Sequence, residues 1–476
     1  MTRTLATLLS LLLAAPAPLL RASAINLPDL GDASTGVISP TQERKLGEDI
    51  LRKARRSLTI VDDPEISAYV QSIGQRLVAR SDAPGVDFRF FVVADPAINA
   101  FAIPGGFIGV HTGLILAAQS EGELASVVAH EVAHITQRHI PRMLAEQQHT
   151  LPTMAAMLAA ILLAGGGGEA AIALTGATMM QKGINFTRSN EEEADRIGMR
   201  ILADAGFDPR GMPAFFERMQ SLNRHNESNL PEFLRTHPVT TARIADSRGR
   251  AERSPYRQVP DSLEFQLTRA KIRAQAAGDA NEIVRGFAHN LEEGKTANPE
   301  AERYGYTLAL TRARRYDAAR GEIRKLVERA PGNISYRMLQ AEIEMAAGRT
   351  DAGLALYASA YKRQPSYYPL AREYGRALLR TNRPREAEPV IRAAIKQRAD
   401  DPPLYQMLSQ AAGANGRVAE AHQALAEYYY LNGNPNAAIE QLRLAARAAG
   451  NNFYVQSSVE ARVQAIKEEV ALYQQK

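Results

Sequence analysis

Residues 130–134 read HEVAH, which places two histidines four positions apart around a glutamate. In an α-helix, residues four apart lie on the same face, so the imidazoles of His130 and His134 project side by side. Glu131 points about 100° away from His130, which lets its carboxylate approach a bound water without being a metal ligand. The pattern predicts a zinc hydrolase centre, and the alternative is a pair of histidines that only pack within a helix.

The third protein ligand that a catalytic zinc site needs must come from elsewhere in the chain. His139 lies five positions after His134, about 140° off the ligand face of a continuous helix, so we expect it at the surface or behind the ligands. Residues 191–193 are three glutamates at the start of another predicted helix, where they could also serve only to balance the helix dipole. Asp195 follows Glu191 by one turn on the same face, as expected of a ligand with a supporting carboxylate.

The elements that must position these groups follow from the surrounding pattern. A helix is predicted over 121–138, and an earlier helix has Thr41 as its expected cap. Phe88–Val93 is rich in aromatic and β-branched residues and is typical of a strand. Ala100–Val110 contains two apolar runs that meet at Pro104–Gly106, which predicts a β-hairpin.

An edge strand beside the active-site helix could bind an extended peptide through its main chain, with little dependence on substrate sequence. The predicted hairpin is the natural place for such a strand. The residues expected to form this substrate edge are Phe101, Ala102, Ile103, Phe107 and Ile108.

The composition is that of an ordinary globular protein with more than one domain. The chain has 476 residues, which is too long for a single ordinary core. Its net charge of +5 is mild over this length and gives almost no support for a nucleic-acid partner. It has no cysteine, which excludes disulfides, thiolate zinc ligands, a cysteine nucleophile and a lipid-modified N-terminal cysteine.

The first residues have the pattern of a signal peptide. Met1–Arg3 supply a positive charge, Leu5–Leu20 are apolar, and Ala22–Ala24 offer a small-residue cleavage site. We predict cleavage near Ala24 and export to the periplasm, and the alternative is an uncleaved N-terminal anchor.

A second apolar region lies between the two halves of the predicted metal site. Leu151–Ala164 and Ala170–Met180 are separated by four glycines over Gly165–Gly168. Each segment is too short to span a bilayer, so we expect a buried helix pair or a flap over the site. Peripheral contact with the outer membrane is the alternative.

The C-terminal half contains a repeat of 34 residues. A polar linker over Arg250–Ser262 precedes it, which divides the mature chain into a peptidase domain over 25–255 and a repeat domain over 256–476. Small residues recur at two registers of the repeat and allow paired helices to cross closely, which is typical of tetratricopeptide repeats. An arginine marks each unit: Arg315, Arg349, Arg383 and Arg417.

The motif HEVAH followed by E-x-x-A-D over Glu191–Asp195 resembles the zinc peptidase family of the CaaX prenyl protease and the heat-shock membrane protease. The resemblance implies that Glu191 is the third ligand, and Arg188 and Gly198 also match the family. We expect Arg188 and Asp195 to lie directly behind the ligands. The chain departs from the membrane-spanning members because it lacks their several long apolar helices.

The combination of signal peptide, peptidase domain and repeats is similar to periplasmic members of this family. In those relatives the histidine of a T-H-P segment lies close to the zinc and acts as a switch, a role that would fall to His237 within RTHPVTTARI. Its imidazole could occupy the fourth zinc position or stabilise the oxyanion during hydrolysis. It could also only fix a proline turn. Arg243 of the same segment could help to orient this loop, but the sequence alone gives it no firm role.

We therefore predict a mainly α-helical protein. An α+β zincin-like metallopeptidase domain with a small β-sheet is followed by an all-α solenoid of tetratricopeptide repeats. One zinc ion per chain, held by His130, His134 and Glu191, would lower the pKa of a bound water toward neutrality. Glu131 would take the proton of the attacking water and return it to the leaving amine.

The resemblance also implies a substrate class. We expect a periplasmic endopeptidase that degrades misfolded or stalled outer-membrane β-barrel proteins and assists their assembly. Its repeat domain would dock the substrate or the barrel-assembly machinery. The alternative is mainly a non-proteolytic chaperone or scaffold on that machinery, but the presence of Glu131 and a full ligand set favours the enzyme.

Overall fold

The computed structural model describes residues 38–472 except 84, 147–187, 226–230 and 256–258. The predicted signal peptide over residues 1–24 and the apolar segments within 151–180 therefore lie outside the described residues. Of the helices that are described, none is both long and apolar enough to cross a bilayer. The described chain is mostly helical with one three-stranded sheet, which confirms the predicted fold class.

The first half of the chain builds the sheet and the helices around it. Ser39, and not the predicted Thr41, caps the first helix: its hydroxyl accepts from the backbone N–H of Gln42, and the Gln42 side chain bonds back to the Ser39 N–H. Pro40 at the first helical position places Thr41 inside the first turn. In chain order the elements are α2 (Pro40–Ala54), α3 (Pro64–Val78), β1 (Arg89–Val93), β2 (Ala100–Ile103), β3 (Phe107–His111), α4 (Thr112–Ala117), α5 (Glu121–Thr136), α6 (His139–Glu146), α9 (Arg188–Asp204), α10 (Gly211–His225), α11 (Glu232–Thr236) and α12 (Thr241–Arg253).

The sheet has β3 at its centre, parallel to β1 and antiparallel to β2. The β2–β3 pair is the predicted hairpin, and it turns through Gly105 and Gly106, whose φ angles of 76° and 96° favour glycine. One face of the sheet packs on α3 and α5, and the other packs on α2. This leaves β2 as the outer strand beside α5.

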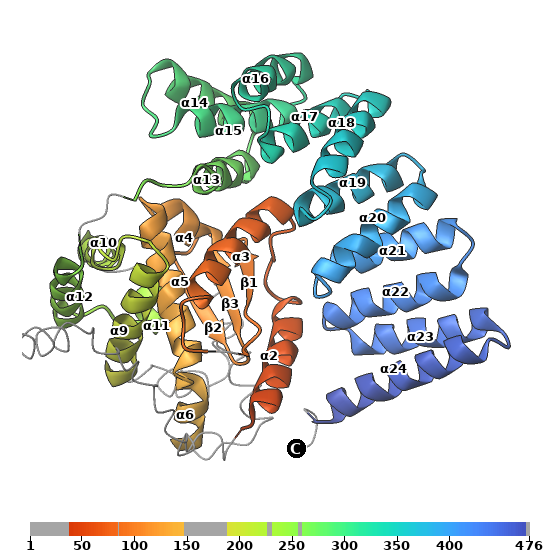
Figure 1. Ribbon diagram of the computed structural model, residues 1–476, viewed down its shortest axis with the longest axis horizontal. Coiled ribbons are helices and arrows are strands. Elements are labelled where there is room, and N and C mark those ends of the chain that lie inside the picture. Colours follow the sequence, from red (N-terminus) through yellow and green to blue (C-terminus); the bar gives the residue numbers. More distant parts are fainter. Residues whose placement is uncertain (1–37, 84, 147–187, 226–230, 256–258, 473–476) are drawn as a thin grey trace, which may run out of the picture.

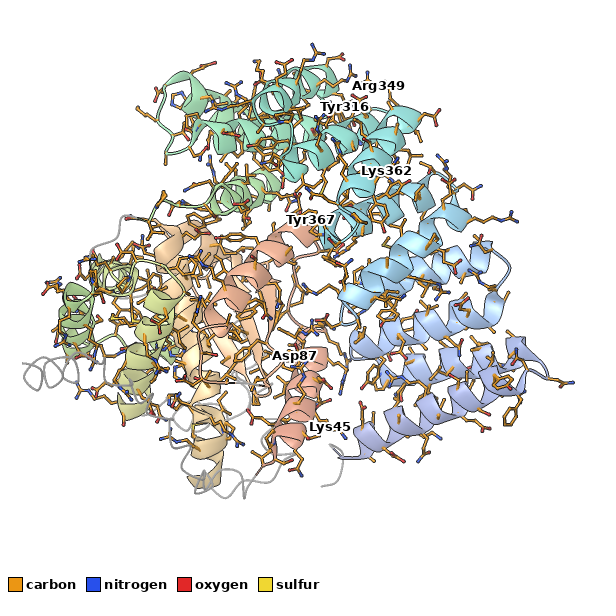
Figure 2. All side chains as sticks on the ribbon, viewed as in Figure 1. Lys45, Asp87, Tyr316, Arg349, Lys362 and Tyr367 are labelled. Atoms are coloured by element: carbon orange, nitrogen blue, oxygen red, sulfur yellow. The ribbon has the colours of Figure 1, made fainter. Side chains whose placement is uncertain are left out.

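The second half of the chain is a stack of antiparallel helix pairs. Each arginine of the predicted 34-residue repeat directly precedes the second helix of a pair, as Arg349 does before α18 (Figure 2). Ala319, Ala341 and Ala387 are completely buried, as expected for the small positions where paired helices cross. The helices are α13 (Leu263–Gln275), α14 (Ala280–Glu292), α15 (Pro299–Arg312), α16 (Tyr316–Arg329), α17 (Ile334–Ala346), α18 (Thr350–Arg363), α19 (Tyr368–Arg380), α20 (Pro384–Gln397), α21 (Pro402–Ala414), α22 (Val418–Leu431), α23 (Pro435–Ala449) and α24 (Phe453–Leu472).

The repeats curve around the peptidase elements (Figure 1), from α13 beside α3 to α24 near α2. Polar contacts join the two parts along this arc. Lys271 of α13 pairs with Asp63 at 2.9 Å, Arg372 of α19 pairs with Asp62, and Arg55 donates to the carbonyl of Leu431 at 3.0 Å. Tyr367, just before α19, lies close to these contacts between the two parts (Figure 2). The solenoid is therefore docked on the peptidase elements rather than extended away from them.

Candidate metal centre

Helix α5 carries the HEVAH motif through the middle of the N-terminal core. The Ser120 hydroxyl caps this helix by accepting from the Glu123 N–H. Nearly every side chain of α5 is buried, and His130 and His134 are each only 1% exposed. Their Nε2 atoms lie 2.9 Å apart. The two imidazoles therefore face the same point, as the four-residue spacing predicts.

Helix α9 brings the acidic motif to the histidines. It crosses α5 at Gly198, where a Cβ atom would lie 3.1 Å from the backbone of Ala129 and His130. This close crossing places the Glu191 carboxylate 3.4 Å from His134 Nε2 and 3.5 Å from His130 Nε2. Of the three predicted candidates over 191–193, Glu191 is the one whose carboxylate lies against both imidazoles.

His237 completes the cluster from the C-terminal end of the short helix α11. Its Nδ1 lies 2.9 Å from a Glu191 oxygen and 3.4 Å from His130 Nε2. One potential ligand atom from each of the four groups lies within 4.8 Å of the others, and all four residues are buried.

The donor set fits a zinc ion. Around a tetrahedral zinc with bonds of 2.0–2.1 Å, neighbouring ligand atoms are separated by about 3.3 Å. Five of the six pairs among His130, His134, Glu191 and His237 have contacts of 2.9 to 3.5 Å, and the whole set of ligand atoms lies within 4.8 Å. Three imidazoles and one carboxylate are also the donors that zinc prefers. His130, His134 and Glu191 could therefore hold the metal as its three ligands, and His237 could take the fourth position.

The charges of the site favour this use. Burial pushes the pKa of His134 well below its ordinary value, which keeps its ring neutral and able to bind a metal. Burial also disfavours the charged form of His130, but bonds to Asp195 and Glu191 outweigh it and raise the pKa to about 10. A metal must therefore displace a proton from His130. Glu191 stays ionised, because the neighbouring histidines outweigh burial and hold its pKa well below the usual range.

Glu131 lies next to the cluster and is 1% exposed. Burial raises its pKa, against the opposing charges of His237 and His130. A carboxylate with a raised pKa is the kind of group that serves as a general base near neutral pH. Its oxygen lies 3.4 Å from His237 Nε2, and it also accepts from the backbone N–H of Ala102 on β2. Glu131 thus stands between the ligand cluster and the outer strand of the sheet.

Asp195 and Arg243 form the layer behind the ligands. Asp195 lies 3.0 Å from His130 Nδ1, so it holds the ring nitrogen that faces away from the cluster. Arg243 forms two bonds of 2.7 Å to Asp195 and lies 2.8 Å from Glu191. It also donates to the carbonyl of Pro238, which ties the His237 loop to the same carboxylates. The sequence offered Arg243 only as a residue that could orient this loop, through its place in the T-H-P segment, and did not predict its contacts with Glu191 and Asp195.

The side chain of Arg188 lies outside this layer of Asp195 and Arg243. Its side chain is 69% exposed at the start of α9 and pairs with Glu192 at 3.6 Å. The guanidinium that contacts Glu191 and Asp195 is that of Arg243, so the structure does not bring Arg188 into the layer behind the ligands as expected.

His139 decides between the two positions that the sequence left open for it. Treating the helix as continuous placed its side chain off the ligand face, either at the surface or behind the ligands. The chain instead leaves α5 after Thr136, passes through Arg138 with φ at 51°, and starts α6 at His139. The ring is completely buried, and its Nδ1 lies 2.8 Å from Nδ1 of His134. The surface alternative is therefore wrong, and His139 lies behind the ligand His134, as the other alternative expected.

The predicted substrate edge is only partly an edge. Phe101, Ala102 and Ile103 belong to β2, whose one sheet neighbour among the described strands is β3. Phe107 and Ile108 belong to β3, which is paired on both sides, by β1 and β2. They cannot add a further strand, because their main-chain groups face two neighbours already.

Comparisons with known proteins agree with this arrangement. Residues 64–251 match Peptidase family M48, and residues 307–369 and 344–412 match tetratricopeptide repeats. A Vibrio cholerae protein provisionally described as a beta-barrel assembly-enhancing protease is 35% identical over 464 residues, 96% of each chain. The beta-barrel assembly-enhancing protease of Escherichia coli is 33% identical over 457 residues, 95% of this chain and 93% of the relative.

A more distant relative matches less than half of the chain. The mitochondrial metalloendopeptidase OMA1 of Arabidopsis thaliana is 28% identical over 222 residues, which cover 44% of this chain and 41% of the relative.

Proposed function

Because the chain belongs to peptidase family M48, as a homologue of the beta-barrel assembly-enhancing proteases, we propose that it is a zinc-dependent endopeptidase of the periplasm. We propose that it degrades misfolded or stalled outer-membrane β-barrel proteins and assists their assembly. The name of the relatives supports the link with β-barrel assembly, and the signal-peptide pattern of residues 1–24 supports export.

The observation that carries the proposal is the convergence of four buried donors on one point. His130 and His134 come from α5, Glu191 comes from α9 and His237 follows α11. Burying a carboxylate among imidazoles costs free energy unless the groups are paired or bind a metal. We assign the three ligands to His130, His134 and Glu191 and the fourth position to His237 in the resting state.

The side chains around the metal can perform peptide hydrolysis. When bound, zinc polarises the scissile carbonyl and makes a water acidic enough to react near neutral pH. Glu131 accepts the proton of the attacking water at its carboxylate and then delivers it to the leaving amine. The N–H of Ala102 orients that carboxylate. Asp195 and Arg243 keep the His130 ring and Glu191 in place.

The outer strand β2 supplies a place for an extended substrate. The His111 N–H donates to the Asn99 carbonyl at 3.0 Å, which marks that pair as hydrogen-bonded. Bonded and non-bonded pairs alternate along an antiparallel ladder, so the main-chain groups of Ala100 and Ala102 point away from β3. The Ala102 N–H is used by Glu131. Ala100 and the Ala102 carbonyl are left to pair with a peptide, independent of its side chains.

The docked repeats give the enzyme a second surface for its partners. Stacked helix pairs form curved surfaces that bind other proteins. We propose that this surface engages the substrate or the barrel-assembly machinery, while its contacts to α2 and α3 hold it near the metal centre. A mainly non-proteolytic scaffold is the second candidate, and it is supported only by the presence of these repeats.

A metal analysis paired with a protease assay tests the proposal. The mature chain should bind one zinc ion and cleave an unfolded outer-membrane β-barrel protein. Glu191→Gln should lose most of the zinc and the cleavage, whereas Glu192→Gln, which changes an exposed neighbour on the same helix, should lose neither. Zinc binding without cleavage in the native chain would support the scaffold instead. Full zinc content in Glu191→Gln would refute the ligand assignment.

A further inference from the structure

The ring nitrogen of His134 that faces away from the cluster has a partner of its own. His134 Nδ1 lies 2.8 Å from His139 Nδ1, and the opposite nitrogen of His139, Nε2, lies 3.1 Å from Oε2 of Glu193. Arg142 Nη1 lies 3.1 Å from the same Glu193 oxygen. A row of imidazole, imidazole, carboxylate and guanidinium thus runs outward from the metal centre.

The fold builds this row from three helices. After α5 the chain turns at Arg138, whose backbone is in the left-handed region. This turn places His139, at the start of α6, against His134. Glu193 comes from α9, two residues after Glu191. The same helix therefore delivers one carboxylate to the cluster and another to the far side of a ligand imidazole.

Proton positions in the row are determined by its ends. A neutral imidazole has one N–H donor and one acceptor nitrogen. If His134 Nε2 gives its lone pair to a metal, its proton is on Nδ1, and His139 Nδ1 must accept. The proton of His139 is then on Nε2 and is donated to Glu193. The opposite arrangement would place the lone pair of His139 Nε2 against the carboxylate, where two acceptors would repel.

The two ligand histidines are therefore held in different ways. His130 Nδ1 lies 3.0 Å from the Asp195 carboxylate, which is a charged acceptor. His134 donates to an imidazole, which is a neutral acceptor. A charged acceptor raises the basicity of the donating ligand more than a neutral one does.

We infer that His139 and Glu193 are positioning residues of the metal centre, which fix the Nδ1–H tautomer and the orientation of His134 so that Nε2 faces the metal. Neither residue belongs to the four-residue cluster that would hold the metal. The inference rests on the proposed zinc site. It adds a specific prediction, namely that zinc affinity depends on a hydrogen-bond acceptor at the position of His139 Nδ1.

Zinc dissociation constants of the full mature chain, measured by competition with a chelator, test the inference. His139→Ala should weaken zinc binding by about 10–100-fold. His139→Asn places an amide oxygen near the position of Nδ1 and should recover most of the affinity. Glu193→Ala should weaken binding less than His139→Ala, and Glu192→Ala on the same turn should not change it.

Three further readouts separate positioning from packing. The visible spectrum of the cobalt-substituted chain should change in His139→Ala and return toward the native spectrum in His139→Asn. Denaturant unfolding of the metal-free variants should show that His139→Asn and Glu193→Ala remain folded. Nitrogen NMR of the zinc-loaded native chain should show His139 as the Nε2–H tautomer.

Three results would overturn the inference: zinc affinity of His139→Ala within twofold of native, equal losses in His139→Ala and His139→Asn, or an Nδ1–H tautomer of His139. If the native chain bound no zinc, the proposed function would fail instead. The two failures are therefore distinguishable.

Discussion

The Nε2 atom of His237 lies 3.4 Å from the Oε1 atom of Glu131. The other ring nitrogen, Nδ1, lies 2.9 Å from Glu191. One imidazole therefore contacts both the proposed general base and the proposed third ligand. A ring in this position fills the corner of the site where water has to enter. The geometry favours a closed resting state over a role of His237 in binding the oxyanion.

Replacing His237 should therefore activate the enzyme. His237→Ala is expected to raise the rate of cleavage of an unfolded substrate severalfold, because the fourth position becomes open to water. The rate would fall if the imidazole mainly stabilised the oxyanion. An unchanged rate would contradict both roles. Initial rates at saturating zinc, compared with native protein, decide among these outcomes.

Glu131→Gln should separate metal binding from catalysis. The amide cannot take up a proton, so the cleavage rate should fall by about 10²–10⁴-fold. The zinc content should remain at one ion per chain, because Glu131 is not among the assigned ligands. Parallel measurement of zinc and of cleavage checks the prediction. Cleavage at the native rate would exclude Glu131 as the base.

Arg243 should be important for stability. Arg243→Gln leaves the buried carboxylates of Glu191 and Asp195 without their cation and should lower the free energy of unfolding by about 3–5 kcal/mol. Urea unfolding of the metal-free chain measures the change. Arg248→Gln is the control on the same helix, since its side chain is 58% exposed and its loss should leave stability nearly unchanged. A similar small change for Arg243 would contradict the assigned role.

Gly433 should matter for docking of the repeats. Its φ is 73°, and a Cβ atom would lie 2.4 Å from the backbone oxygen of Arg52 on α2. Gly433→Ala should therefore loosen the contact between α2 and the α22–α23 turn. Gly416 is a matched control, because its φ is 80° and nothing lies within 4 Å of its Cβ position. Backbone strain at the positive φ should lower the stability of both variants by about 1 kcal/mol.

Solution scattering and limited proteolysis of the linker between α12 and α13, that is, between Arg253 and Leu263, compare these two variants. Only Gly433→Ala should increase the radius of gyration and the rate of linker cleavage. Equal behaviour of the two variants would show that the contact with Arg52 does not hold the repeats.

Glu232 on α11 should make stability depend on pH. Burial, aided by the nearby charge of Asp95, raises its pKa from 4.5 to about 7. The folded state thus favours the protonated carboxyl. The resulting stabilisation is present below pH 4.5 and is lost as the pH rises through about 7. Because the group is partly exposed, we expect about 1 kcal/mol.

Urea unfolding of the metal-free chain between pH 5 and 8 tests this slope. Glu232→Gln mimics the protonated group, so it should match native stability near pH 5 and exceed it near pH 8. The exposed Glu282 is the control. The free energy of unfolding of Glu282→Gln should depend on pH in the same way as that of the native chain. A constant difference between native and Glu232→Gln would disprove the assignment.

Local periodicity let the sequence determine several features. The four-residue spacing of His130 and His134 defines a shared helix face wherever that helix lies. The 34-residue recurrence of arginine and small residues defines a helix-pair repeat for the same reason. The hairpin at Gly105 and Gly106 also follows from local conformation. Glu191 was reached as a ligand through the resemblance of its motif rather than by periodicity.

Only the tertiary structure decided which of several equivalent side chains reach the metal. Glu191, Glu192 and Glu193 are adjacent in sequence, yet the first faces the cluster, the second is exposed and the third contacts His139. That division depends on the close crossing of α9 over α5 at Gly198. The burial of His139 depends on one left-handed residue, and the role of Arg243 depends on where α12 packs. Contacts between distant segments carry no periodic signal, because the packing geometry that creates them is not encoded in local spacing.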